Sequence, residues 1–222
     1  FMNYFSLKLL KIYLKRHSLL RILQIKECLN IYLKGISIEF GAVKNRDKTF
    51  SNFFDGKSKF RYSNIKKFKN SNIISLDLTK KLKVKSNKFD NVLLFNVLEH
   101  LNDHNKTFSE IFRILKKNGL LIGSTPFLYQ VHGVPNDYFR FTKNFFEKKL
   151  KKNKFKEIKI KNLGFGPSVA SYSLLHSYLK YLPIFSDLLL LIAFIFDSII
   201  QIFVKTQLKE IYPIGIMFIA KK

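Results

Sequence analysis

The chain has 222 residues and a mass of 26.2 kDa, and its 47% hydrophobic and 25% charged residues exclude wholesale disorder and fibrous structure. Its single cysteine, Cys28, excludes an internal disulfide framework and a cysteine-rich zinc site, so a reduced, cytoplasmic protein is expected. The net charge of +25 favours anionic partners or reflects a lysine-rich coding bias; because no nucleic-acid-binding module is recognisable, no nucleic-acid partner is expected.

Residues 1–34 are predicted to form a basic amphipathic cap helix ahead of the main domain. Leu7, Leu10 and Leu14 share one face of this helix, and lysines occupy another. The lysines interrupt the segment throughout, which argues against a signal peptide. Such a helix packs on the domain or lies on a membrane surface, and the sequence favours the packed arrangement.

The middle of the chain alternates strand and helix patterns. The expected elements are strands at 36–40, 60–65, 73–78 and 89–95, a helix at 104–117 and a strand at 120–123. This alternation predicts one Rossmann-like α/β domain over 35–222, with a mostly parallel sheet and helices on both faces.

The last third of the chain combines a basic helix with apolar segments. Thr142 is predicted to cap a helix that runs to about 152, followed by a strand at 155–160. Residues 168–208 form an apolar helical insertion before the last strand, which is expected at 214–220.

Within this insertion, 182–204 is interrupted by Asp187, Asp197 and Gln201. Its uncharged runs are shorter than the roughly 18 apolar residues that a membrane-spanning helix needs. At about 100° per residue these polar side chains fall within one arc of the helix. We therefore predict a non-spanning helix whose wide apolar face lies in the membrane interface or is covered by other helices or a partner subunit.

Polar residues and glycines follow the predicted strands at their carboxyl ends, where α/β sheets bind ligands. Glu39 lies near the end of the first strand and Gly41 follows it, Asp77 lies near the end of the third, and Asn96 and Glu99 follow the fourth. A glycine at such a position lets the backbone approach a ligand closely, and a carboxylate can accept hydrogen bonds from hydroxyl or amino groups.

Three motifs give the chain a family resemblance. The run FDNVLLFNVLEHL at 89–101 resembles the "FD-apolar-LEHL" segment of class I S-adenosylmethionine-dependent methyltransferases of the type-11 group. RILKKNGLL at 113–121 resembles that group's "R-x-L-K-P-G-G" segment, and IEFGA at 38–42 resembles its first motif, which holds the methionine part of the cofactor. The resemblance covers about 36–165 and implies S-adenosyl-L-methionine as the cofactor.

The resemblance also assigns cofactor-binding residues. The residues assigned to the amino-acid end of the cofactor are Glu39, Phe40, Gly41 and Ala42. The ribose is assigned to Asn64, the adenine to Asp77 and Leu78, and the sulfonium to Asn96. Asn64 replaces the carboxylate that usually binds the ribose, and Val43 and Lys44 stand where relatives often carry further glycines. These departures keep open the alternative of an inactive methyltransferase-like module that binds a partner.

A fourth motif, PFLYQVHGVPNDYFRFT at 126–142, resembles a loop in a branch of these enzymes associated with bacterial surface-polysaccharide and sugar modification. A histidine with a pKa near neutrality suits the deprotonation of a hydroxyl, so His132 is the predicted catalytic base. Alternatively, His132, Asp137 and Arg140 lock the loop by hydrogen bonds. The predicted acceptor-binding residues are Glu99, His100, Tyr129, Asp137, Tyr138 and Arg140.

The pair Glu99-His100 has a further interpretation. It is similar to an acid-and-histidine segment that helps to bind a divalent metal in some ubiquinone-pathway O-methyltransferases. Asn96 stands where those enzymes have another acid, which leaves at most two good ligands, fewer than a hard cation normally takes. No metal is therefore expected.

The predicted function is O-methylation of a sugar or glycolipid-type acceptor, a small molecule or a glycan. One alternative is a membrane-soluble aromatic acceptor, and the other is the inactive partner-binding module. The protein is expected in the cytoplasm, with possible attachment to the inner face of the membrane through 182–204 and the N-terminal helix.

Overall fold

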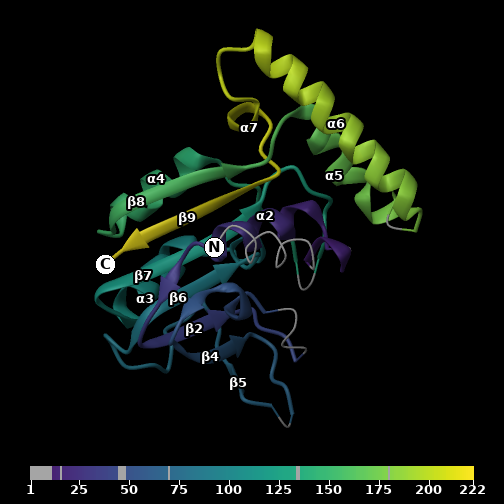
Figure 1. The fold of residues 1–222 in the computed structure, drawn as a ribbon. Helices are drawn as coiled ribbons and strands as arrows, with labels where there is room; N and C mark the ends of the chain where they lie inside the picture. Colours follow the sequence, from purple (N-terminus) through teal and green to yellow (C-terminus); the bar gives the residue numbers. More distant parts are fainter. Residues whose placement is uncertain (1–11, 16, 45–48, 70, 134–135, 180) are drawn as a thin grey trace. The chain divides into compact units, whose positions relative to one another are not determined.

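The computed structural model describes residues 12–15, 17–44, 49–69, 71–133, 136–179 and 181–222. The chain divides into two compact units, whose path is drawn in Figure 1. The sheet unit contains residues 28–125, 131–161 and 217–222. The helical unit contains residues up to 27, together with 126–130 and 162–216.

Seven strands of the described residues form the main sheet. Their order is β5 (Ile73–Ser75), β4 (Lys59–Asn64), β2 (Ile36–Phe40), β6 (Phe89–Phe95), β7 (Leu115–Pro126), β9 (Gly215–Lys221) and β8 (Lys156–Leu163). The first five of these strands pair in parallel. β9 runs antiparallel to β7, since backbone hydrogen bonds join Asn118 to Lys222 and Phe127 to Ile214. The predicted mostly parallel, Rossmann-like sheet is confirmed.

The sheet core follows from the apolar run in β6. Val92, Leu93 and Leu94 are fully buried, as expected for a parallel strand covered on both faces. Helix α3 (His104–Ile114) buries Phe108 and Ile111 and starts at Asp103, whose side chain accepts a hydrogen bond from the Lys106 N–H group. Helix α4 (Lys143–Lys152) starts at Thr142, which caps it as predicted.

The predicted helix over 104–117 is wrong at its end. α3 stops at Ile114, and Leu115 begins β7 by pairing with Phe89 of β6. The following residue, Lys116, places its Nζ atom 2.9 Å from the carboxylate of Asp90. Strand pairing and this ion pair therefore keep Leu115 and Lys116 in β7, although helix propensity alone would place them in the last turn of α3.

The predicted helix over 1–34 also ends earlier than expected. Helix α2 covers Leu19–Cys28, and Tyr32–Leu33 form β1, which pairs with β3 (Asp55–Gly56). A Cβ atom on Gly56 would lie 2.1 Å from the Leu33 carbonyl oxygen, so glycine permits this close pairing. The part of the prediction over 1–11 lies outside the described residues.

The helical unit contains the predicted insertion before the last strand. It consists of α5 (Pro167–Leu179), α6 (Pro183–Phe203) and α7 (Leu208–Ile211), and α5 and α6 lie side by side (Figure 1). Because α5 and α6 pack on each other, each covers one stripe of its neighbour.

The polar stripe of α6 faces into the helical unit. The buried Asp197 carboxylate accepts hydrogen bonds of 2.9 Å from the N–H groups of Ser168 and Val169, at the start of α5. The Ser186 hydroxyl pairs with that of Tyr172, and the Asp187 carboxylate accepts a hydrogen bond from Tyr13. These partners satisfy the polar groups that interrupt the apolar sequence of this helix.

The opposite side of α6 is apolar and exposed. Its exposed residues are Ile184, Phe185, Leu188, Leu191, Ile192, Ile195, Phe196, Ile199, Ile202 and Phe203. Among the described residues, α6 is the one helix long and apolar enough to cross a membrane by length and composition, a test that core helices of soluble proteins also pass. In α6, however, only 22% of the most apolar window is buried.

Candidate functional site

A cavity of about 330 Å³ opens at the carboxyl ends of β2, β4 and β6. The order of strands along the chain reverses between β2 and β6, which is where open α/β sheets bind their ligands. The residues that line the cavity are Phe40, Gly41, Val43, Asn64, Ile65, Lys66, Phe68, Leu76, Leu78, Asn96, Val97, His100 and Leu101. Five predicted cofactor residues are among them, namely Phe40, Gly41, Asn64, Leu78 and Asn96.

Two of these residues have left-handed backbone conformations, just beyond the ends of their strands. Gly41 has φ +77°, and a Cβ atom there would lie 2.6 Å from Cγ2 of Val97. Asn96 has φ 53°, a conformation that asparagine tolerates better than most residues. Glycine is therefore required after β2, because a side chain would enter the space that Val97 and the cavity share.

Three predicted cofactor residues do not line this cavity. The buried Glu39 carboxylate accepts hydrogen bonds of 2.8 and 2.9 Å from the N–H groups of Phe50 and Ser51, so it holds the turn at 49–53. Ala42 is buried next to Gly41. Asp77 lies beyond the end of β5 rather than in it, because β5 stops at Ser75.

Hydrogen bonds occupy the polar groups of Asp77 and Asn64. Asp77 accepts hydrogen bonds from the backbone N–H and the hydroxyl of Thr79. The Asn64 amide donates to the Ala42 carbonyl oxygen at 2.9 Å, and its oxygen accepts from the Lys66 N–H group at 2.9 Å. Asn64 thus joins the turns that follow β2 and β4. It lines the cavity with an uncharged amide in place of the carboxylate that usually binds the ribose.

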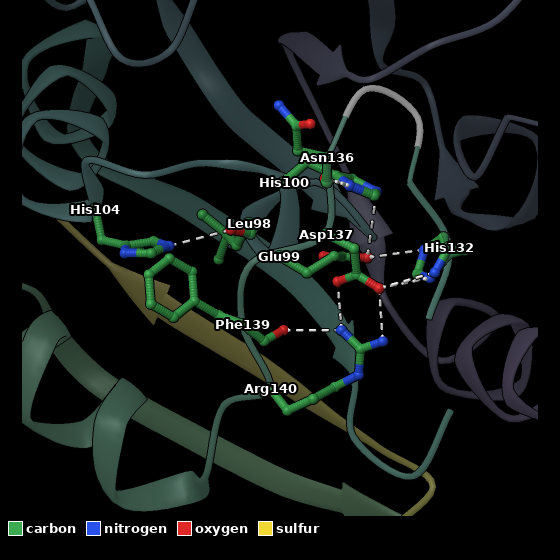
Figure 2. A network of polar contacts seen from close by, with 9 residues as sticks. All are labelled: Leu98, Glu99, His100, His104, His132, Asn136, Asp137, Phe139 and Arg140. Carbon is green, nitrogen blue, oxygen red and sulfur yellow. Dashed lines mark hydrogen bonds and ion pairs between the residues drawn. The ribbon is translucent and has the colours of Figure 1, made fainter. Parts of the chain in front are cut away.

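Next to this cavity lies a cluster of three side chains, Glu99, His100 and His132, which we call the imidazole cluster (Figure 2). Glu99 and His100 belong to a short 3-10 helix (Leu98–His100) that follows β6. His132 comes from the loop within the 126–142 motif, and the backbone N–H of Tyr138 holds this loop by donating to the Glu99 carbonyl oxygen at 2.9 Å. Since His100 also lines the cavity, the cavity and the cluster form one continuous site.

Both imidazoles point their Nε2 atoms toward Glu99. The Nε2 atoms of His100 and His132 each lie 3.9 Å from Oε1 of Glu99. On the other side of the rings, Nδ1 of His132 lies 3.2 Å from the Asp137 carboxylate, and Nδ1 of His100 contacts the Asn136 carbonyl oxygen. An acceptor oxygen at each Nδ1 fixes its proton there and leaves the lone pair on Nε2.

Asp137 connects the loop to a cation. Its carboxylate binds the Arg140 guanidinium through both oxygens and accepts a hydrogen bond of 3.0 Å from the His132 N–H group. The hydrogen bond from Arg140 lowers the pKa of Asp137 well below its usual range. Asp137 is therefore ionised, and its bonds to Arg140 and to the His132 N–H group hold this part of the loop together.

Glu99 is the unusual member of the cluster. Its side chain is fully buried, and neither carboxylate oxygen has a hydrogen-bond partner among the described residues. Burial raises the pKa of Glu99 to about 8, because desolvation disfavours the charged form. A buried carboxyl group without a donor is costly, and it calls for a ligand.

The two remaining residues predicted to bind the acceptor, Tyr138 and Tyr129, lie in different units of the chain. Tyr138 is half exposed and its hydroxyl accepts a hydrogen bond from the Asn136 amide. Tyr129 belongs to the helical unit, where it is partly buried. The sequence analysis missed Asn136, whose contribution is a backbone carbonyl oxygen, and Val97, whose side chain sets the space above Gly41. Neither contribution leaves a signal in residue type.

Comparisons with known proteins support the fold. Residues 55–123 match a family described as "Methyltransferase domain". No curated protein matches the chain. An S-adenosylmethionine-dependent methyltransferase structure from Archaeoglobus fulgidus has a TM-score of 0.53 and 13% identity over 97% of this chain and 94% of its own.

Two further structures share the fold. One is phosphoethanolamine N-methyltransferase 2 of Haemonchus contortus in complex with S-adenosyl-L-methionine, with a TM-score of 0.53 and 17% identity over 89% of this chain. This chain spans about half of the Haemonchus protein, 51% of its length. The other is a putative methyltransferase of Haloferax volcanii in complex with the activator Trm112, with a TM-score of 0.53 and 10% identity over 90% of this chain and 88% of that one.

These findings identify the fold of the chain. The strand order, the cavity at the reversal of that order, and the family match inside the sheet all belong to one architecture. The chain therefore has the fold of class I methyltransferases, and its residues 55–123 match the methyltransferase-domain family.

Proposed function

We propose that the chain is an S-adenosylmethionine-dependent methyltransferase that acts on a hydroxyl group of a sugar or glycolipid-type acceptor. The observation that carries the proposal is the continuity of the cavity beyond β2, β4 and β6 with the imidazole cluster, through His100. A cofactor in the cavity and an acceptor at the cluster would then meet at that residue.

The cavity residues fit the cofactor. The volume of about 330 Å³ lies within the range of small-molecule sites. Glycine at position 41 and the left-handed turn at Asn96 bring backbone close to the ligand. When bound, S-adenosylmethionine supplies an electrophilic methyl group: the acceptor oxygen bonds to the methyl carbon, the sulfur–carbon bond breaks, and S-adenosylhomocysteine and one proton are released.

The imidazole cluster fits the activation of a hydroxyl. Nε2 of His132 carries a lone pair, because the Asp137 carboxylate lies at Nδ1. His132 is about one-third exposed, so an acceptor can reach it. We assign His132 to the activation of the acceptor hydroxyl, Asp137 to the orientation of His132, and Glu99, His100, Tyr138 and Arg140 to the surroundings of the acceptor.

The first test is calorimetric titration of the purified protein with S-adenosylmethionine and S-adenosylhomocysteine. We expect micromolar binding of both. An acceptor panel of nucleotide sugars, glycolipids and lipid-soluble phenols then follows, with phosphoethanolamine included because the Haemonchus protein of the same fold is an N-methyltransferase. Absence of binding up to millimolar concentration by the folded protein would instead support the inactive, partner-binding alternative.

A second proposal concerns the exposed side of α6. We propose that this side rests on the anionic inner face of a membrane. Apart from Ser198, the exposed residues of α6 are apolar over its whole length, its acids Asp187 and Asp197 are bonded within the helical unit, and the chain carries a net charge of +25. An apolar helix face in a strongly basic protein matches an anionic lipid surface better than a neutral one.

Sedimentation with lipid vesicles tests this proposal. We expect the protein to pellet with anionic vesicles and less with zwitterionic ones, and the triple variant Leu188→Gln, Ile195→Gln, Ile202→Gln to stay in the supernatant. Ile74→Gln, at an exposed residue of β5, is the matched control and should pellet like the wild type. If the triple variant also pelleted normally, or if the wild type formed a stable dimer and ignored vesicles, the membrane proposal would fail.

A further inference from the structure

Three side chains of the imidazole cluster offer ligand atoms to one point. The ligand atoms of Glu99, His100 and His132 all lie within 4.8 Å of one another. Ligands about 2.1 Å from a tetrahedral cation are roughly 3.4 Å apart, so the two separations of 3.9 Å from Oε1 of Glu99 would shorten by about half an ångström around a shared cation.

The surroundings of the cluster provide the second argument. A metal-bound histidine almost always gives its other ring N–H group to a carboxylate or a backbone carbonyl. Here Nδ1 of His132 faces the Asp137 carboxylate and Nδ1 of His100 faces the Asn136 carbonyl oxygen. Both Nε2 lone pairs are thereby aimed toward Glu99, which Figure 2 shows between the two rings and Asp137.

The third argument is Glu99 itself. This carboxyl group is fully buried, and its two oxygens have no hydrogen-bond partner among the described residues. The nearby Arg140 guanidinium is already bound to both oxygens of Asp137. A cation at the cluster would supply the positive charge that this buried carboxylate otherwise lacks.

We propose that Glu99, His100 and His132 bind a divalent transition-metal ion of the zinc type at the acceptor side of the site. Two imidazole nitrogens and one carboxylate oxygen are the donors that such ions prefer, whereas calcium and magnesium prefer oxygen alone. Three protein ligands leave coordination positions open, as in catalytic rather than structural sites.

No metal was expected from the sequence because it offered too few ligands, and the structure supplies a further one. The sequence offered only the adjacent Glu99 and His100, because Asn96 takes the place of an acid. The loop returns His132 to the same point, and His132 is the third ligand. Such an ion would bind the acceptor hydroxyl and lower its pKa, so His132 would activate the hydroxyl through the ion; this role, unlike metal binding itself, rests on the proposed function.

Metal binding is tested on the full chain by calorimetry and by metal analysis after dialysis. We expect one Zn²⁺ per chain with micromolar or tighter affinity, and no binding of Mg²⁺ at the same concentration. His100→Ala, His132→Ala and the isosteric Glu99→Gln should each weaken Zn²⁺ binding at least about tenfold. His176→Ala, at a histidine of α5 outside the cluster, is the matched control and should bind like the wild type.

Circular dichroism establishes that each variant is folded, and titration with S-adenosylhomocysteine separates the two proposals. Zn²⁺ binding without cofactor binding would overturn the proposed function and leave the metal site intact. Cofactor binding without Zn²⁺ binding, or Zn²⁺ binding equally strong in His132→Ala and Glu99→Gln, would overturn the metal site alone.

Discussion

Gly41→Val should abolish the binding of S-adenosylhomocysteine. A Cβ atom at position 41 would lie 2.6 Å from Cγ2 of Val97, and both residues line the cavity. Valine would therefore push Val97 aside or fill the cavity with its own methyl groups. Because each loss of about 1.4 kcal/mol weakens binding tenfold, even Gly41→Ala should reduce the affinity by at least about tenfold, as calorimetry would measure.

The double variant Gly41→Ala, Val97→Ala is the control for this prediction. It removes the methyl group that the new Cβ atom meets, so it should bind more tightly than Gly41→Ala alone. Recovery should be partial, because alanine still adopts φ near +77° at a cost of about 1–3 kcal/mol, which weakens the turn. Normal cofactor binding by a folded Gly41→Val protein would show that the cofactor lies elsewhere.

His132→Ala should abolish methyl transfer to the acceptor while leaving cofactor binding unchanged. His132 does not line the cavity, so the affinity for S-adenosylhomocysteine should match that of the wild type. The loss of the Nε2 lone pair should reduce the transfer rate by about 10² to 10⁴, the range for a group that activates a hydroxyl. The measurement is transfer of a labelled methyl group to the acceptor that the panel identifies.

His176→Ala again serves as the control, since this histidine contacts the Tyr172 ring in α5 rather than the site. Its transfer rate should equal that of the wild type. A fully active His132→Ala protein would exclude His132 from the chemistry. The ion pair between Asp137 and Arg140 would then serve only to hold the loop in place.

Much of the sheet could be predicted from the sequence, because the middle of its central strand, β6, is apolar and fully buried. Val92, Leu93 and Leu94 form a continuous apolar run that only a strand covered on both faces can use. The end of α3 could not be predicted in this way. Leu115 and Lys116 have good helix propensity, and only the pairing with Phe89 and the contact with Asp90 place them in β7.

The candidate site shows the same division. Asn64 ends its strand, and Gly41 and Asn96 follow theirs directly, so their places in the cavity follow from the order of strands in a parallel sheet. The contact of His132 with Glu99 and His100 does not follow from the order of the strands. It depends on the path of a loop, fixed by the bond from Tyr138 to the Glu99 carbonyl oxygen, and no local pattern encodes such a contact.

The inward-facing polar stripe of α6 has a consequence for how this sequence is maintained. Asp197 and Ser186 hold α6 to α5, so the outward isoleucines and leucines add little to the free energy of folding. Polar replacements on that side would be nearly neutral for the fold and would improve solubility. The proposed contact with a membrane would account for an apolar surface that folding does not require and that solubility disfavours.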